Sequence, residues 1–263
     1  MNKNAPIGVM DSGVGGLSVV CALKDVLPQE NIIYYGDTAN CPYGNKTNDE
    51  LLQLSGNMLD FLESKGIKCL ALACNTTSAL ADVLRERFQT PIITVAECAA
   101  DAIGKTGLKN VGLLATVSTV RSGIYERRIH QFSPDAEVQS VGSANLAALI
   151  ENNRSDIPLL EQEIRSNLDS MLHCHEIKSV ILGCTHYPLI QDVFEKLYPG
   201  VEFLDPAPYQ AASVKNYLET QALAAVHQKP ALQIFTTGSE EHFIRACEEH
   251  QLQSHYTITV TRI

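Results

Sequence analysis

The chain has no apolar run of membrane-spanning length and no excess of positive charge. A membrane-spanning helix needs ~20 consecutive apolar residues, and no run in these 263 residues approaches that length. Lys and Arg number 20 against 30 Asp and Glu, which gives a net charge of −10. Nucleic-acid surfaces need clustered Lys and Arg. We therefore expect neither a membrane protein nor a partner of nucleic acid.

Low-complexity tracts and an apolar signal-peptide core are also missing. Residues 1–6 lead directly into the first apolar segment, without such a core. Eight cysteines are present, and in a long, core-rich chain without an export signal they are expected to be reduced thiols. With 45% hydrophobic residues, the chain can form one large domain or two of ordinary size. We expect a cytoplasmic globular protein.

No motif for a metal or an organic cofactor is recognisable. His173-Cys174-His175 resembles a metal-binding cluster, but no second pair of ligands follows at a suitable spacing. No Lys stands beside a glycine-rich phosphate loop, as a pyridoxal enzyme would require. We therefore expect no metal and no cofactor.

A glycine-rich turn, Asp11-Ser12-Gly13-Val14-Gly15-Gly16, follows the first predicted strand. Such a turn exposes backbone N–H groups to an anion. Its spacing is not the full dinucleotide fingerprint, and an aspartate at its mouth would repel a phosphate. The turn is therefore interpreted as a contact for a carboxylate or ammonium group, and the alternative is a tight turn in which Asp11 only serves as a cap.

Two cysteines occupy matching settings and are separated by 110 positions. Cys74 follows the apolar run 70–73, and Cys184 follows the apolar run 179–183. Each lies where a parallel strand is predicted to end and a helix to begin, which is the usual place for ligand contacts in an open α/β sheet. Polar side chains come directly after each thiol: Asn75 and Thr76 after the first, Thr185 and His186 after the second.

The duplication extends beyond the thiols. Segments 7–12, 36–40 and 92–95 match 111–116, 142–145 and 201–204 in the same order, with offsets of 104, 106 and 109 positions. The sequence therefore predicts two pseudo-symmetric α/β domains with parallel sheets and a cleft between them. If the halves face each other, both thiols point into this cleft from opposite sides. A carbon acid between two proton-transfer groups can then lose a proton on one face and regain it on the other, as racemisation or epimerisation requires.

Strand and helix patterns alternate along the chain, which favours parallel sheets with covering helices. Strands are expected at 7–10, 31–35, 69–73, 92–95, from 111, and at 138–141, 179–182, 202–204, 232–236 and 257–260. Helices are expected at 16–27, 48–65, 78–88, 98–104, 122–132, 156–174, 189–197, 211–219 and 240–250. The tail after about residue 207 has no counterpart in the second array. We therefore predict a discontinuous first domain, 1–97 plus 207–263, and a second domain, 98–206.

The residues around the thiols suit proton transfer. A thiol with a pKa of ~8.5 is mostly protonated at neutral pH, and a helix N-terminus or an imidazolium favours the thiolate. His186 can supply the imidazolium at Cys184, and Asn75 and Thr76 offer donors for a substrate carboxylate at Cys74. Cys41 lies in a polar loop, of the kind that lines substrate pockets, but it lacks the strand-then-turn setting.

Four motifs together resemble the glutamate racemase family across essentially the whole chain. They are Asp-Ser-Gly-Val-Gly-Gly-Leu-Ser at 11–18, Tyr-Gly-Asp-Thr-Ala at 35–39 with Pro-Tyr-Gly at 42–44, Ala-Cys-Asn-Thr-Thr-Ser-Ala at 73–79, and Gly-Cys-Thr-His-Tyr-Pro-Leu at 183–189. The resemblance implies a cofactor-independent racemase that interconverts L- and D-glutamate and supplies D-glutamate for peptidoglycan. A homodimer is left open.

The resemblance also implies roles for individual residues. Cys74 and Cys184 would be the two acid/base residues, with Asp11 assisting the first thiol and Glu151 with His186 assisting the second. Substrate contacts would come from Asp11, Ser12, Pro42, Tyr43, Gly44, Asn75, Thr76, Thr185 and His186.

Two departures from the family pattern bear on the pocket wall. Asn40 and Cys41 stand where the family commonly has an arginine and an apolar residue, and the run 147–150 before Glu151 lacks a usual proline. Three alternatives remain open: a racemase of the same family for aspartate or another amino acid, a cysteine hydrolase with Cys184 as nucleophile and His186 as base, and a non-catalytic amino-acid-binding protein. Related aspartate racemases usually have Cys-Thr-Glu at the second site.

Overall fold

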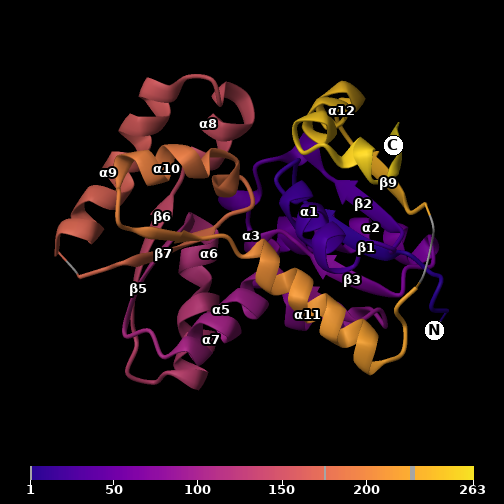
Figure 1. The fold of residues 1–263 in the computed structure, drawn as a ribbon, viewed down its shortest axis with the longest axis horizontal. Helices are drawn as coiled ribbons and strands as arrows, with labels where there is room; N and C mark the ends of the chain where they lie inside the picture. The colour runs from indigo at the N-terminus through magenta and orange to yellow at the C-terminus, as the bar shows by residue number, and fades with distance from the viewer. Residues whose placement is uncertain (1, 175, 226–228) are drawn as a thin grey trace.

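Two parallel β-sheets, each covered by helices on both faces, organise the protein (Figure 1). The computed structural model describes residues 2–174, 176–225 and 229–263. The first sheet has the strand order β10-β9-β2-β1-β3-β4, and the second has the order β6-β5-β7-β8. All neighbouring strands are parallel. The predicted fold class, two similar α/β units with parallel sheets, is confirmed.

The strands of the first sheet are β1 (Ile7–Asp11), β2 (Ile32–Gly36), β3 (Cys69–Leu72), β4 (Ile92–Thr94), β9 (Ala231–Thr236) and β10 (Thr257–Arg262). Those of the second are β5 (Asn110–Thr116), β6 (Glu137–Ser143), β7 (Ser179–Gly183) and β8 (Glu202–Leu204). β1, β2, β3 and β7 are buried along their whole length, which explains their continuous apolar sequences, because helices cover both faces of a parallel sheet. The edge strand β10 is exposed at every second residue or more.

The order β2-β1-β3-β4 in the first sheet recurs as β6-β5-β7-β8 in the second. β3 and β7, the strands that precede Cys74 and Cys184, therefore occupy equivalent positions. The first sheet is extended beyond β2 by β9 and β10, which come from the end of the chain. This extension has no counterpart in the second sheet.

Helices from different parts of the chain cover the first sheet. α1 (Leu17–Val26) packs with α11 (Ala207–Thr220) on one face, and α2 (Asn48–Ser64) and α4 (Ala81–Arg87) cover the other. α12 (Glu240–Glu249) follows β9 and contacts β10. The short α3 (Asn75–Ser78) comes directly after Cys74.

The second sheet is covered by α5 (Val95–Thr106) and α7 (Ile124–Phe132) on one face and by α8 (Leu146–Asn153), α9 (Ile157–Cys174) and α10 (Gln191–Leu197) on the other. α6 (Val117–Ser122) follows β5. In Figure 1 the elements of this sheet lie on the left and those of the first sheet on the right. Among the described residues, no helix combines the length and the apolar character needed to cross a membrane.

Candidate active site

Cys74 and Cys184 line the same buried cavity. Each follows the carboxyl end of its strand, β3 or β7, and their exposed fractions are 5% and 6%. The cavity is also lined by residues from both halves of the chain: Ser12, Pro42, Tyr43, Gly44, Asn75, Thr76, Thr116, Ala147, Thr185 and His186. The structure therefore brings together the two thiols and eight of the predicted substrate contacts. Asp11 and Glu151, the remaining two predicted site residues, lie behind this lining.

On the Cys74 side, a buried carboxyl group sits below the glycine-rich turn. Asp11 is 1% exposed; it accepts a hydrogen bond from the Gly13 backbone N–H at 3.0 Å and one from the Thr185 hydroxyl at 3.2 Å. Burial raises the pKa of Asp11, against the opposing effects of His186 and these donors. Burial, together with the charge of Asp11, raises the pKa of the Cys74 thiol to about 12. Cys74 is therefore a protonated thiol at neutral pH in this state.

On the Cys184 side, the thiol, an imidazole and a carboxylate form a chain. Cys184 Sγ lies 3.7 Å from His186 Nδ1, and His186 Nε2 lies 2.6 Å from Glu151 Oε2. Burial disfavours the charged ring, but hydrogen bonds to Cys184, Cys41 and Glu151 raise the pKa of His186 well above its usual range. Burial opposes the charge of Glu151 as well, and the hydrogen bond from His186 still lowers the pKa of that carboxyl. The chain can carry a proton away from Cys184 or return it.

A buried amide donor faces the cavity beside Cys74. The Tyr125 hydroxyl donates to Asn75 Oδ1 at 2.6 Å, which fixes the orientation of the amide. Asn75 Nδ2 is buried and has no hydrogen-bond partner within the described part of the chain. Leaving a buried donor unpaired costs ~1–3 kcal/mol. A ligand carboxylate in the cavity would supply the missing acceptor.

The Pro42–Tyr43–Gly44 turn is held in place from both halves of the molecule. The Tyr43 hydroxyl donates to Asp37 Oδ2 at 2.6 Å, and the Ser118 hydroxyl donates to the Gly44 carbonyl at 2.7 Å. A Cβ atom at Gly44 would lie 2.9 Å from the Cβ of Thr116, so only glycine allows this approach. The turn therefore closes the cavity against the second half of the protein.

Three residues at the site were not predicted from the sequence: Thr116, Tyr125 and Ala147. Thr116 shares a hydrogen bond of 3.0 Å with Thr76. It is the counterpart of Ser12 in the matched segments 7–12 and 111–116, so the duplication contained a signal for it. Tyr125 had no such signal. Ala147 belongs to the run 147–150 that precedes Glu151, and the structure places it on the cavity wall.

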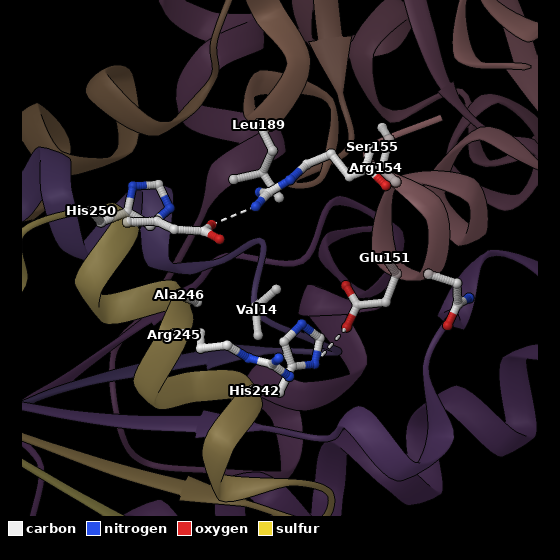
Figure 2. A pocket seen from close by; sticks show the side chains of 12 residues that line it. Val14, Glu151, Arg154, Ser155, Leu189, His242, Arg245, Ala246 and His250 are labelled. Atoms are coloured by element: carbon white, nitrogen blue, oxygen red, sulfur yellow. Dashed lines mark hydrogen bonds and ion pairs between the residues drawn. The ribbon is translucent and has the colours of Figure 1, made fainter. Parts of the chain in front are cut away.

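A second cavity, of about 380 Å³, lies between α8 and α12 (Figure 2). Glu151 reaches toward His242 across it, and their nearest atoms, Oε1 and Nδ1, are 3.7 Å apart. Arg154, directly after α8, forms an ion pair with Glu249 at the end of α12. The basic side chains along this cavity come from both helices and their ends: Arg154, His242, Arg245 and His250. Glu151 thus contacts His242 in the second cavity through one carboxylate oxygen and His186 through the other.

One group of side chains has the composition of a metal site. Ligand atoms of Cys41, Glu151 and His186 all lie within 4.8 Å of one another, and this is the only such group in the described ranges. The suspected cluster at 173–175 is not of this kind: His173 Nδ1 donates a hydrogen bond to the Asp169 carbonyl, and His175 lies outside the described residues.

Two similar α/β units that each place a thiol in one shared cavity are the arrangement expected of an amino-acid racemase with two bases. The Asp/Glu/Hydantoin racemase family model matches residues 7–214. The chain belongs to this family, and the resemblance predicted from the motifs is confirmed.

Known relatives agree with this assignment. The glutamate racemase of Desulforudis audaxviator is 42% identical over 212 residues, which cover 80% of this chain and 76% of that protein. The crystal structure of the glutamate racemase isoform RacE1 from Bacillus anthracis matches with a TM-score of 0.91 and 33% identity, covering 99% of this chain and 98% of that one. The Francisella tularensis glutamate racemase in complex with D-glutamate matches with a TM-score of 0.89 and 31% identity, covering 99% and 98%.

Proposed function

We propose that the protein interconverts L- and D-glutamate without a cofactor, with Cys74 and Cys184 as the two acid/base residues. The observation that carries this proposal is the entry of both thiols into one cavity from equivalent strands. A planar carbanion between them would be reprotonated from the face opposite to the one that lost the proton.

Each thiol has its own proton acceptor in this proposal. When Cys184 is the base, its thiol proton passes to His186 Nδ1, and Glu151 stabilises the resulting imidazolium through Nε2. When Cys74 is the base, its proton passes to Asp11, whose pKa is raised by burial and which is therefore a better proton acceptor than an exposed carboxylate. In either direction, the thiolate Sγ takes the α-proton and the opposite thiol donates one.

The carbanion has no electron sink, so its charge must be stabilised by hydrogen-bond donors on the substrate carboxylate. The unpartnered Asn75 Nδ2 supports this part of the proposal. The Asp11 carboxylate is suited to accept hydrogen bonds from the ammonium group. The proposed substrate contacts are Asp11, Ser12, Pro42, Tyr43, Gly44, Asn75, Thr76, Thr185 and His186.

The names of the relatives support glutamate as the substrate. With that substrate, the protein would act in the cytoplasm and supply D-glutamate for peptidoglycan. We also propose the domains 1–97 with 207–263, and 98–206, since β9 and β10 extend the first sheet and α11 packs on α1. A homodimer is the assembly to be checked by light scattering.

Exchange of the α-hydrogen tests the proposal. The purified protein, dialysed against a chelator, is incubated in D2O with L-glutamate, D-glutamate or either enantiomer of aspartate, and NMR follows the α-hydrogen signal. We expect loss of this signal and growth of the opposite enantiomer with both glutamates. Exchange with aspartate alone would assign another substrate, and release of a hydrolysis product without exchange would favour the cysteine hydrolase. Binding without exchange would favour a binding protein.

A further inference from the structure

We infer that Cys41, Glu151 and His186 form a binding site for a zinc-type divalent cation, and that an ion bound there inhibits proton transfer at Cys184. The site goes beyond the proposed function, because the proposed racemisation needs no metal. It would make the protein sensitive to free Zn²⁺ through a thiol that takes no part in catalysis.

The three ligand atoms are already close to a coordinating arrangement. They lie within 4.8 Å of one another. In a tetrahedral zinc site, with bonds of 2.0–2.3 Å, ligand atoms are about 3.5 Å apart. His186 Nε2 and Glu151 Oε2, now at 2.6 Å, would separate slightly to admit the ion between them. Cys41 Sγ and His186 Nε2 both lie beside Gly13: a Cβ atom added to this glycine would be 3.3 Å from each of them.

The donor set suits zinc. Thiolate, imidazole and carboxylate are the ligands that Zn²⁺ binds in proteins, and three protein ligands with one open position form a common site. Cys41 and Glu151 are half-buried and line a cavity of about 220 Å³ next to His242, which gives an ion a path from solvent. The carboxylate balances part of the charge of the ion.

The inhibition follows from the position of the second ring nitrogen. His186 Nδ1 lies 3.7 Å from Cys184 Sγ. An ion bonded to Nε2 confines the ring proton to Nδ1, so the ring can no longer accept the proton of Cys184. Glu151, when bound to the ion, also stops stabilising an imidazolium. The base form of Cys184 is then no longer produced through this chain.

Metal binding to variants of the full-length protein tests the inference, with no added thiol reagent. Co²⁺ reports a bound thiolate by a charge-transfer band in the near ultraviolet, and calorimetry measures Zn²⁺ binding. We expect one ion per chain and a Co²⁺–thiolate band in the unchanged protein. Cys41→Ser should lose the band and bind Zn²⁺ at least about tenfold more weakly, and Glu151→Gln should weaken Zn²⁺ binding similarly.

Two matched thiol variants locate the site. Cys174→Ser removes an exposed thiol next to His173, and Cys184→Ser removes the other thiol beside His186. Both should keep the band and the Zn²⁺ affinity. A band lost in either of them, or an affinity unchanged in Cys41→Ser, would overturn the inference. In racemase assays, the half-inhibitory Zn²⁺ concentration should rise about tenfold in Cys41→Ser. Because binding is measured without turnover, a protein inactive on glutamate would count only against the proposed function.

Discussion

At the residue scale, the two thiols have equivalent strands but different surroundings. Cys74 is next to a buried carboxyl, Asp11, while Cys184 faces the His186–Glu151 pair. The two halves of the fold are therefore approximately symmetric, but the groups that would accept the protons of the two thiols differ. Each thiol can be tested separately for this reason.

Replacing either thiol by serine should stop racemisation while leaving one proton abstraction intact. Cys74→Ser and Cys184→Ser should each lower racemisation at least about 100-fold, because a hydroxyl is too weak a base for an α-proton. Each variant should still catalyse elimination from a glutamate analogue with a β-leaving group, since elimination needs one base only. The two variants should prefer opposite enantiomers, and a chiral assay of the remaining substrate measures this preference.

Cys41→Ser is the matched control for these variants. Cys41 also lies close to His186 but does not line the cavity with the two thiols. It should therefore racemise glutamate at a rate close to that of the unchanged protein. Elimination from the same enantiomer by both thiol variants, or equal damage from Cys41→Ser, would contradict the two-thiol mechanism.

Glu151→Gln should lower the pKa of His186. The hydrogen bond from His186 to this carboxylate is one of the contacts that raise the pKa of the ring well above its usual range, despite burial. A raised pKa stabilises the folded protein below the unfolded-state pKa of ~6.5, and this stabilisation is lost as pH rises through the folded-state pKa. The variant should thus lose stability at acidic to neutral pH and less at high pH.

NMR titration of the His186 ring and urea unfolding at several pH values measure these two effects. Glu151 also has a lowered pKa, so its own contribution is present above ~4.5 and disappears as pH falls through the folded-state value. The unfolding free energies of the variant and the unchanged protein should therefore be compared above pH ~5. There the contribution of the Glu151 carboxylate, which the variant lacks, no longer changes with pH. An unchanged His186 titration would show that Glu151 does not hold the imidazolium.

The sequence predicted most of the site because its motifs follow strand ends, where parallel strands meet in space. It missed Tyr125, whose partner Asn75 is 50 positions away and is reached only through packing of α7. The sequence offered His186 as an imidazolium for Cys184 but did not give their separation, which is 3.7 Å in the structure. Side-chain directions at a turn depend on backbone angles that residue types alone do not fix.

At the element scale, strands were predicted more accurately than helices. Buried apolar runs have clear ends, whereas several helix limits depend on single turns. The helix expected at 122–132 corresponds to α7, which starts after Gly123, and α6 before it was not predicted. Gly123 separates the two helices with a φ of +62°, a left-handed conformation that favours glycine. α8 was not predicted as a helix, and α5 starts at Val95 because the Thr94 side chain caps it by accepting from the Glu97 N–H.

A buried ion pair joins four segments of the chain at the amino ends of the first sheet. Lys68 Nζ lies 2.6 Å from Glu30 Oε2 and donates to the carbonyls of Lys3 and Leu223. Both charged side chains are almost completely buried, with exposed fractions of 0% and 2%. Removing one partner of such a pair leaves an uncompensated buried charge.

Lys68→Met should lower the free energy of unfolding by about 3–5 kcal/mol. The double variant Lys68→Met/Glu30→Leu should lose less than the single variant, because no buried charge remains, and urea unfolding of both measures the difference. Lys24→Met, which removes the half-buried partner of the exposed Asp25, is the control and should cost no more than about 1 kcal/mol. Equal costs for Lys68→Met and Lys24→Met would show that the buried pair is unimportant.

At the scale of the whole molecule, the two halves are closed on each other. The cavity between the thiols has a volume of about 10 Å³, about what a single water molecule needs. Hydrogen bonds from Tyr125 to Asn75 and from Ser118 to Gly44 join the halves across it. Glutamate cannot enter until these contacts change. The duplicated strand order could be read from the sequence, but the degree of closure could not, because it depends on side-chain contacts between distant segments.

Opening should be visible through a tryptophan placed on α12, since the chain contains none. Arg245 lines the cavity between α8 and α12 (Figure 2), whereas its neighbour Ile244 is 45% exposed and does not. Arg245→Trp should change its fluorescence saturably with D-glutamate, and Ile244→Trp should not. Saturable binding by calorimetry with no change in Arg245→Trp would show that α8 and α12 keep their spacing.

Thermodynamics limits how far the unequal surroundings of the two thiols can affect the reaction. Enantiomers have the same free energy in achiral solution, so the equilibrium constant of the proposed racemisation is one. The values of kcat/KM in the two directions must then be equal, whatever Asp11 or the His186–Glu151 pair contributes. The difference between the surroundings of the two thiols can therefore change kcat and KM between the two directions, but only by factors that cancel in kcat/KM. No substitution in either half can therefore favour one direction at equilibrium, and each must change kcat/KM in both directions by the same factor.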